Sequence, residues 1–258
     1  MNDSVCTADI QNYVSFIGFL LASRSEPTPK EIQSRLLKAA EADYLSAKII
    51  YTLVFADVFD SQYSNDLSAK QSYSRYAPYI LSLHFFGEWR QDHIVDKFFL
   101  ASQFASEAVR RGVIEAHLLK HFFNYVQYKG ENNEASKRDA AVSLLVLASF
   151  LNKTEMARQH LIKFLALDRV ELESFEADSQ SAVARVLADP ENSVCGQDKE
   201  CVLGLNIKRV VCDVRDRNGQ TLYRIDKRSC TRLSEPLIHL YRQTVANAFD
   251  SFISGMNP

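Results

Sequence analysis

From residue 91 to residue 189 the sequence is a succession of amphipathic segments separated by breaks of only a few residues. Apolar residues within each segment recur at helical spacing, which predicts helices over residues 91–111, 113–129, 134–151, 154–167 and 168–189. Because the breaks are too short to carry the chain elsewhere, each helix must fold back against its predecessor. We therefore expect stacked antiparallel helix pairs, with an irregular helical bundle as the alternative.

The N-terminal part of the chain carries clear helix-start signals. Thr28 can cap a helix, Pro29 suits its first turn and Glu31 can close a capping box. These three residues predict a helix that begins at Pro29, and a second helix is expected over residues 45–59.

Glycine and proline are scarce, with 8 and 6 in 258 residues, which favours long helices over a turn-rich β fold.

Single residues indicate where several helices begin or end. Pro78 is expected to open a short apolar helix that stops near Gly87. Gly112 and Gly130 occupy positions where a left-handed residue commonly ends a helix. Asp178 is a possible break in the 168–189 helix.

A nine-residue element recurs in which a helix ends, a turn follows and an alanine sits early in the next helix. Its copies are residues 39–47, 108–116 and 149–157, and their last residues are Ala47, Ala116 and Ala157. Small residues at such positions allow two helices to cross closely.

On these residues the chain resembles the Sel1-like and tetratricopeptide-like repeat families over residues 30–190. The resemblance depends on Lys38-Ala39-Ala40-Glu41, on Gly112 and on the three alanines, of which Ala116 and Ala157 lie 41 residues apart. It implies an α-solenoid whose extended surface binds another protein.

The character of the sequence changes after Pro190. Two β-prone runs, residues 207–217 and 220–226, flank Asn218-Gly219, which is a strong signal for a two-residue hairpin turn. That turn places Val214 opposite Tyr223 and Asp213 opposite Arg224. A final helix is expected from Ser234, with one apolar side.

Five cysteines offer a choice of chemistry. Cys195, Cys201, Cys212 and Cys230 are clustered, whereas Cys6 lies apart. Their spacing lacks the Cys-x2–4-Cys knuckles of structural zinc sites, so disulfides are favoured and an oxidising compartment with them. Three pairings are possible for four cysteines, and free thiols in a reducing cytosol remain the alternative.

No catalytic motif stands out. There is no Gly-x-Ser-x-Gly elbow, no phosphate-binding glycine loop and no His-Glu-x-x-His sequence. His117 and His121 share a helical face and could hold a metal, but surface or groove lining is the favoured interpretation. His84 and Glu88 could join them in a nonstandard enzyme site. We expect no enzyme activity, no cofactor and no metal.

Aromatic doublets are the best candidates for partner contacts. They are Phe85-Phe86, Phe98-Phe99 and Phe122-Phe123, and the single tryptophan is Trp89. Adjacent residues on a helix cannot share one narrow face, so one member of each doublet should be only partly buried. Phe86 and Trp89 are therefore predicted to contact a partner, together with His117 and His121.

Charge is unevenly distributed, although the formal net charge is only −2, which argues against a general nucleic-acid binder. Residues 205–232 carry eight basic and three acidic side chains, whereas residues 168–191 carry two basic and seven acidic ones. Either these segments face each other, or the basic hairpin meets an acidic partner through Arg215, Arg217 and Arg224.

No apolar run reaches the 18 or so residues that a membrane helix needs. The apolar stretch at 13–22 follows Asp3 and Asp9 and shows helical spacing, so a core helix is favoured over a signal peptide. Whether a leader was removed before Met1 stays open.

The sequence thus predicts a mainly α protein: an α-solenoid of stacked antiparallel helix pairs with a small C-terminal β-hairpin and a terminal helix. The expected domains are a repeat domain, 1–190, and a cysteine-containing cap, 191–258. We expect a protein-binding scaffold that is periplasmic or secreted. The resemblance and the cysteines suggest an immunity protein that occludes a bacterial toxin. A cytosolic adaptor and, less favoured, an enzyme are the alternatives.

Overall fold

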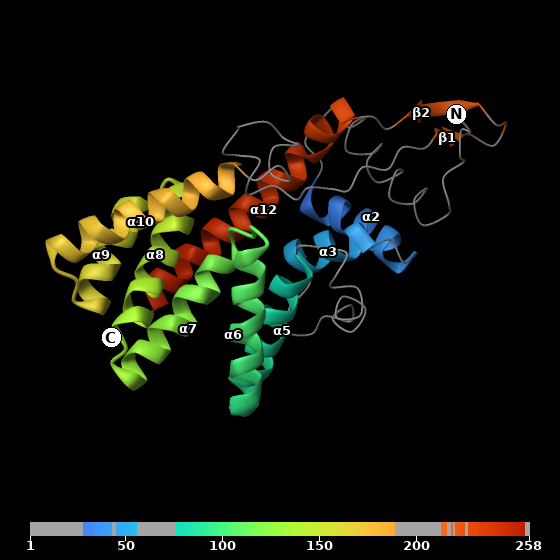
Figure 1. Ribbon diagram of the computed structural model, residues 1–258. Coiled ribbons are helices and arrows are strands. Elements are labelled where there is room, and N and C mark those ends of the chain that lie inside the picture. Colours follow the sequence, from blue (N-terminus) through green and yellow to red (C-terminus); the bar gives the residue numbers. More distant parts are fainter. Residues whose placement is uncertain are drawn as a thin grey trace. The chain divides into compact units, whose positions relative to one another are not determined.

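The computed structural model describes residues 28–42, 45–55, 76–188, 213–215, 218, 220–224 and 227–255, with the backbone alone at 45, 46, 49, 53, 213–215, 221–224 and 227–238. Within these residues the chain is mainly α-helical, which confirms the predicted fold class at that level (Figure 1).

The chain divides into two units that interleave along the sequence. One consists of Met1–Asp57 and Gly204–Tyr241, and the other of Val58–Leu203 and Arg242–Pro258. The helix α12 (Lys227–Gly255) begins in the first unit and ends in the second. This division differs from the expected boundary between residues 190 and 191, because the C-terminal end of α12 packs with the helices of the second unit.

The described residues of the first unit form α2 (Pro29–Glu41), α3 (Leu45–Val54), two strands and the start of α12. The predicted capping box is confirmed: the Thr28 amide donates to the Glu31 carboxylate at 2.9 Å, and the Glu31 amide donates to Thr28 Oγ1 at 3.4 Å. Helix α2 buries the apolar face formed by Ile32, Leu36, Ala39 and Ala40.

The strands β1 (Asp213–Arg215) and β2 (Thr221–Arg224) pair antiparallel. Asp213 lies opposite Arg224 and Val214 lies opposite Tyr223, after which the register shifts so that Arg215 lies opposite Thr221. A two-residue turn without a bulge would instead have placed Arg215 opposite residue 222. Gly219 lies outside the described residues, so the two-residue turn itself stays a prediction.

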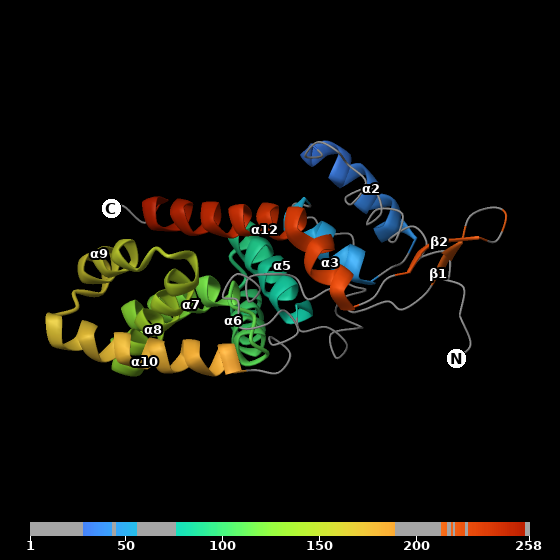
Figure 2. The same ribbon diagram turned by 90° about the horizontal axis from the view of Figure 1, so that it is seen from above.

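Among its described residues, the second unit contains six successive helices and the end of α12. The six are α5 (Ala77–Asp92), α6 (Val95–Arg110), α7 (Ala116–Glu131), α8 (Glu134–Leu151), α9 (Thr154–Leu165) and α10 (Arg169–Ala188). Each of the pairs α5 and α6, α6 and α7, α7 and α8, and α8 and α9 is in contact, and α10 also packs on α8 (Figures 1 and 2).

Helix α8 is the centre of this unit. Eight of the nine residues from Ala140 to Ala148 are buried, so the helix has almost no solvent-facing side over that stretch. A helix that is apolar on most of its circumference must be enclosed by others. Contacts with α7, α9 and α10 provide that enclosure.

Five helix ends in this unit finish with a residue in the left-handed conformation, with φ between 50° and 77°; the residues are His93, Gly112, Asn132, Asn152 and Ala166. Such a residue reverses the chain directly after a helix and lets its amide reach back to the last carbonyls. The prediction for Gly112 is confirmed. The prediction that Gly130 ends a helix was wrong, because α7 continues to Glu131 and Asn132 takes the left-handed position.

Several other boundaries differ from the sequence predictions. The break expected between Gly87 and residue 91 lies instead at residues 93 and 94, between α5 and α6, and α7 begins at Ala116 rather than at residue 113. Helix α5 passes through Gly87, which is buried, because packing of the pair outweighs the roughly 1 kcal/mol penalty of a glycine in a helix. Helix α10 continues through Asp178, and α12 begins at Lys227 rather than at Ser234.

The recurring alanines lie where the repeat element placed them. Ala47, Ala116 and Ala157 each sit in the first turn of a helix and are fully buried. Ala108, at the end of α6, is equally buried. A methyl side chain at these points allows the backbones of two helices to approach closely.

Ala166 provides a test of the turn geometry. A non-glycine residue in the left-handed region carries a penalty of about 1 kcal/mol, and Ala166 is exposed, so its side chain contributes little packing. We expect Ala166→Gly to raise the free energy of unfolding by about 1 kcal/mol in urea titrations. The matched change Ala184→Gly, at an exposed site inside α10, should lower it by about as much. Destabilisation by both changes would contradict the left-handed cap.

Candidate functional site

Aromatic side chains from α5, α6 and α7 meet over small residues. Ala101 and Ala105 of α6 and Leu119 and Phe123 of α7 form a buried cluster. Six larger, partly buried side chains pack against it: Tyr79, Leu83, Phe85, Phe86, Phe98 and Phe122. The two alanines leave the space that so many rings require, so the three helices share one aromatic core.

Edge-to-face contacts organise this core. Ring centroids are 5.1 Å apart for Phe86 and Phe122, and 5.0 Å apart for Phe98 and Phe123. Trp89 stands at 5.1 Å from Phe98 and 5.7 Å from Phe86, and Phe98 in turn contacts Phe99 at 6.2 Å. The cluster therefore extends from the interior to the surface at the turn between α5 and α6.

That turn is held by several polar contacts. His93 takes the left-handed conformation and its amide donates to the Trp89 carbonyl at 2.7 Å. The Ile94 amide donates to Asp92 Oδ1 at 3.0 Å, while Lys97 Nζ contacts Asp92 at 2.5 Å and Glu88 at 3.2 Å. The hydrogen bond from Lys97 holds the pKa of Asp92 below its usual value.

Apolar side chains project into solvent from this ordered turn. Ile94, Val95, Phe99 and Leu100 are 48%, 60%, 59% and 38% exposed. We call these four residues the α5–α6 edge. They are four of the seven large hydrophobic residues that are exposed within the described parts of the chain, and they occupy a single run of seven residues. Several exposed apolar side chains this close together in the chain are typical of a protein-binding site.

The predicted aromatic candidates are linked to this edge through Phe98. Trp89 contacts both Phe98 and Phe86, and Phe86 and Trp89 are half-buried rather than exposed. For Phe98-Phe99 the rule for adjacent aromatics is confirmed, with Phe98 half-buried and Phe99 exposed. Sequence reasoning missed Ile94, Val95 and Leu100, because isolated aliphatic residues near a helix start carry no signal of exposure.

The two predicted histidines are not at the surface. His117 and His121 are 7% and 0% exposed, because the face of α7 that carries them is covered by neighbouring helices. The interpretation of this pair as surface or groove lining was therefore wrong, and their contact with a partner stays a prediction. His121 instead contacts His160 of α9, with ring centroids 5.7 Å apart, and Phe252 of α12 at 5.4 Å.

Burial governs the protonation of this group. Desolvation lowers the pKa of His117 to about 3 and those of His121 and His160 to about 4. Nearby Lys120 and Lys163 add to the effect at His117 and His160 respectively. Among the described residues, no group of three or more histidine, cysteine, aspartate or glutamate side chains is arranged to hold a metal ion.

The remaining predicted residues are outside what the structure describes. Side chains are not described for Arg215, Arg224 and Cys230, and the described residues do not include Arg217. The same holds for Cys6, Cys195, Cys201 and Cys212, so their roles and pairing stay predictions.

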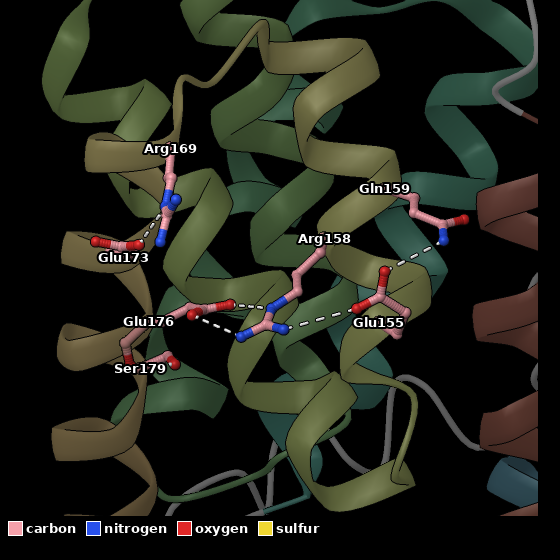
Figure 3. A network of polar contacts seen from close by, with 7 residues as sticks. All are labelled: Glu155, Arg158, Gln159, Arg169, Glu173, Glu176 and Ser179. Atoms are coloured by element: carbon pink, nitrogen blue, oxygen red, sulfur yellow. Dashed lines mark hydrogen bonds and ion pairs between the residues drawn. The ribbon is translucent and has the colours of Figure 1, made fainter.

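The acidic character of residues 168–191 finds partners within the second unit. Arg158 of α9 forms a two-pronged ion pair with Glu176 of α10, with Nη2 at 2.8 Å from Oε2, and also approaches Glu155 at 3.6 Å (Figure 3). From α8, Lys137 binds Glu171 at 2.7 Å and Arg138 binds Asp178 at 2.7 Å, so these pairs also tie α10 to its neighbours.

These pairs offer a third explanation of the charge pattern. The sequence left two possibilities for the acidic segment and the basic hairpin, namely mutual contact or a partner for the hairpin. Three of the carboxylates on α10 are instead matched by basic residues of α8 and α9.

No helix among the described residues is long and apolar enough to cross a bilayer. Comparisons with protein families, with curated proteins and with solved structures found no match. The resemblance to Sel1-like and tetratricopeptide-like repeats therefore stays a prediction.

The ion pair between Arg158 and Glu176 can be tested against an exposed one. Glu176 is 17% exposed and binds with two oxygens, so Glu176→Gln should lower the free energy of unfolding by about 1 kcal/mol, and by less in about 1 M salt. Glu173, 61% exposed, pairs with Arg169 one turn away, and Glu173→Gln should change stability by less than about 0.5 kcal/mol. Equal effects would show that the contact between helices adds nothing.

Proposed function

We propose that this chain is a protein-binding scaffold of stacked helix pairs and that its partner binds the α5–α6 edge. The observation that carries the proposal is the run of exposed apolar side chains at Ile94, Val95, Phe99 and Leu100. Burial of these side chains by a partner would remove apolar surface from water, which is the main favourable contribution to association.

The order of the edge supports the same function. Lys97 ties Asp92 and Glu88 together, and the exposed Phe99 packs on Phe98, which in turn packs on Trp89. A surface that is already ordered loses little conformational freedom when it binds. The α5–α6 edge therefore has the features of a preformed contact site.

The packing of the helices is consistent with a solenoid. In such arrays the second helix of one pair packs on the second helix of the next, and α8 contacts α10 in this way. Buried alanines at the starts of α7 and α9, Ala116 and Ala157, are in keeping with a repeated close crossing.

A narrower proposal combines the repeat resemblance with the clustered cysteines. In it, the protein is a periplasmic immunity protein that occludes the active site of a delivered toxin. The alternative is a cytosolic adaptor with reduced cysteines, and an enzyme with a nonstandard site is less favoured. The compartment is the property that separates the first two.

Site-specific photocrosslinking tests the edge. A photoreactive residue at position 99 should give one discrete crosslinked protein in the native cells, whereas the same residue at position 170 should not. Val170 is a suitable control because it is 74% exposed and lies on α10 of the same unit. Equal crosslinking from both positions would contradict a specific edge.

Paired substitutions then measure what the edge contributes. Val95→Ser with Phe99→Ser should weaken binding of the crosslinked partner by roughly 30-fold in calorimetric titrations, with little change in melting temperature. The control, Ile162→Ser with Val170→Ser, removes two exposed apolar side chains elsewhere and should leave binding unchanged. Loss of binding in the control alone would contradict a binding site at the α5–α6 edge and would place it near Ile162 and Val170.

Thiol titration decides between the compartments. If the four clustered cysteines form two disulfides, then denatured, unreduced protein from its native cells should expose one reactive thiol of the five. Five reactive thiols would exclude the periplasmic immunity protein and favour the cytosolic adaptor.

A further inference from the structure

The end of α12 packs on two buried histidines. The Phe252 ring lies 5.4 Å from the imidazole of His121 on α7 and 6.1 Å from that of His160 on α9. The two imidazoles are 5.7 Å from each other and are 0% and 3% exposed. The three rings form one contact between three helices of the second unit.

Among the described residues, neither histidine has a hydrogen-bond partner for a second proton. His121 Nδ1 lies 2.8 Å from the Ala140 carbonyl, which can only accept, so Nδ1 carries the proton of the neutral ring. His121 Nε2 and both ring nitrogens of His160 are buried and have no partner within the described part of the chain. A protonated ring would bury N–H groups, and a charge, without an acceptor.

The charged groups around these rings make protonation harder still. Lys163, on the helix of His160, lowers the pKa of that ring, and the nearby His160 lowers the pKa of His121. From α8 the group that faces His121 is the neutral Ala140 carbonyl. On α12 the carboxylate of Asp250 forms an ion pair with Lys153.

We propose that residues 242–255 of α12 act as a pH-controlled latch, which is packed on α7 and α9 while His121 and His160 are neutral and separates when both rings are protonated. Side-chain contacts hold this segment on the other helices, and a short helix that loses such contacts is only marginally stable in water, so separation also opens its backbone amides to exchange. Those contacts include the ones made by Phe252, by Asp250 with Lys153, and by the buried Phe249, whose ring lies 5.9 Å from Lys153 Nζ.

The sign of the pH dependence follows from the direction of the shifts. Each ring has a pKa of about 4 when packed and an ordinary value of 6.5 when exposed to water. The separated state therefore binds protons that the packed state does not, so packing is at full strength above pH 6.5 and weakens as the pH falls toward 4. Between pH 7 and pH 5 the separation equilibrium should rise by about 20-fold for each ring, or by several hundred-fold for two.

Amide hydrogen exchange on the full chain tests the latch. Exchange of residues 242–255, corrected for the intrinsic effect of pH, should accelerate by several hundred-fold between pH 7 and pH 5. Amides of the central helix α8 should stay protected over the same range. If α8 opened in parallel, the transition would be global acid unfolding, and the latch would be excluded; so would exchange that does not depend on pH.

Replacement of one histidine tests whether the two rings cause the acceleration of exchange at low pH. His160 makes no hydrogen bond through its ring within the described residues, so His160→Phe removes a titrating group without removing a hydrogen bond, and the acceleration should fall to about 20-fold. His160→Leu, which introduces a smaller apolar side chain, should reduce the acceleration to the same value. His239→Gln alters an exposed histidine of the same helix and should leave the acceleration at the wild-type value. An unreduced acceleration in both His160 variants would overturn the proposal.

Discussion

Close approach of helices at alanine side chains is the constraint on which the second unit depends. Ala108, Ala116 and Ala157 are fully buried at helix ends and starts, and left-handed residues such as Asn132 and Asn152 reverse the chain within one or two positions. Turns this short can join two helices only if their backbones come close. Larger side chains at the alanine positions would separate the helices and would require longer connections.

The same constraint determines where the large side chains go. Alanines on α6 make room for rings from α5 and α7. At the turn between α5 and α6, no further helix in the described part of the chain covers the side chains. Phe99 and its neighbours are left in water there, while Trp89 is held half-buried behind them. On the other side of α7, enclosure by α9 and α12 places His121 and His160 in a dry environment that keeps both rings neutral at pH 7.

Local signals predicted the local structure well. The capping box at Thr28 and Glu31 was correct because both its hydrogen bonds are made within one turn of chain, and the bounds of α8 were correct to the residue. Gly87 and Gly130 were misassigned as helix ends, since the packing of a helix on its neighbours outweighs a single unfavourable residue. The exposed edge was found only in part, through the doublet Phe98-Phe99.

The sequence by itself determined that the chain is mainly helical, where most helices begin and end, and which small residues lie at their crossings. Periodicity, caps and turn residues act over a few positions, so they can be read along the chain. Only the tertiary structure decided that His121 meets His160, 39 positions away, and that Ile94 and Val95 remain uncovered. Burial and exposure depend on which helices pack together, and residues distant in the sequence make those contacts.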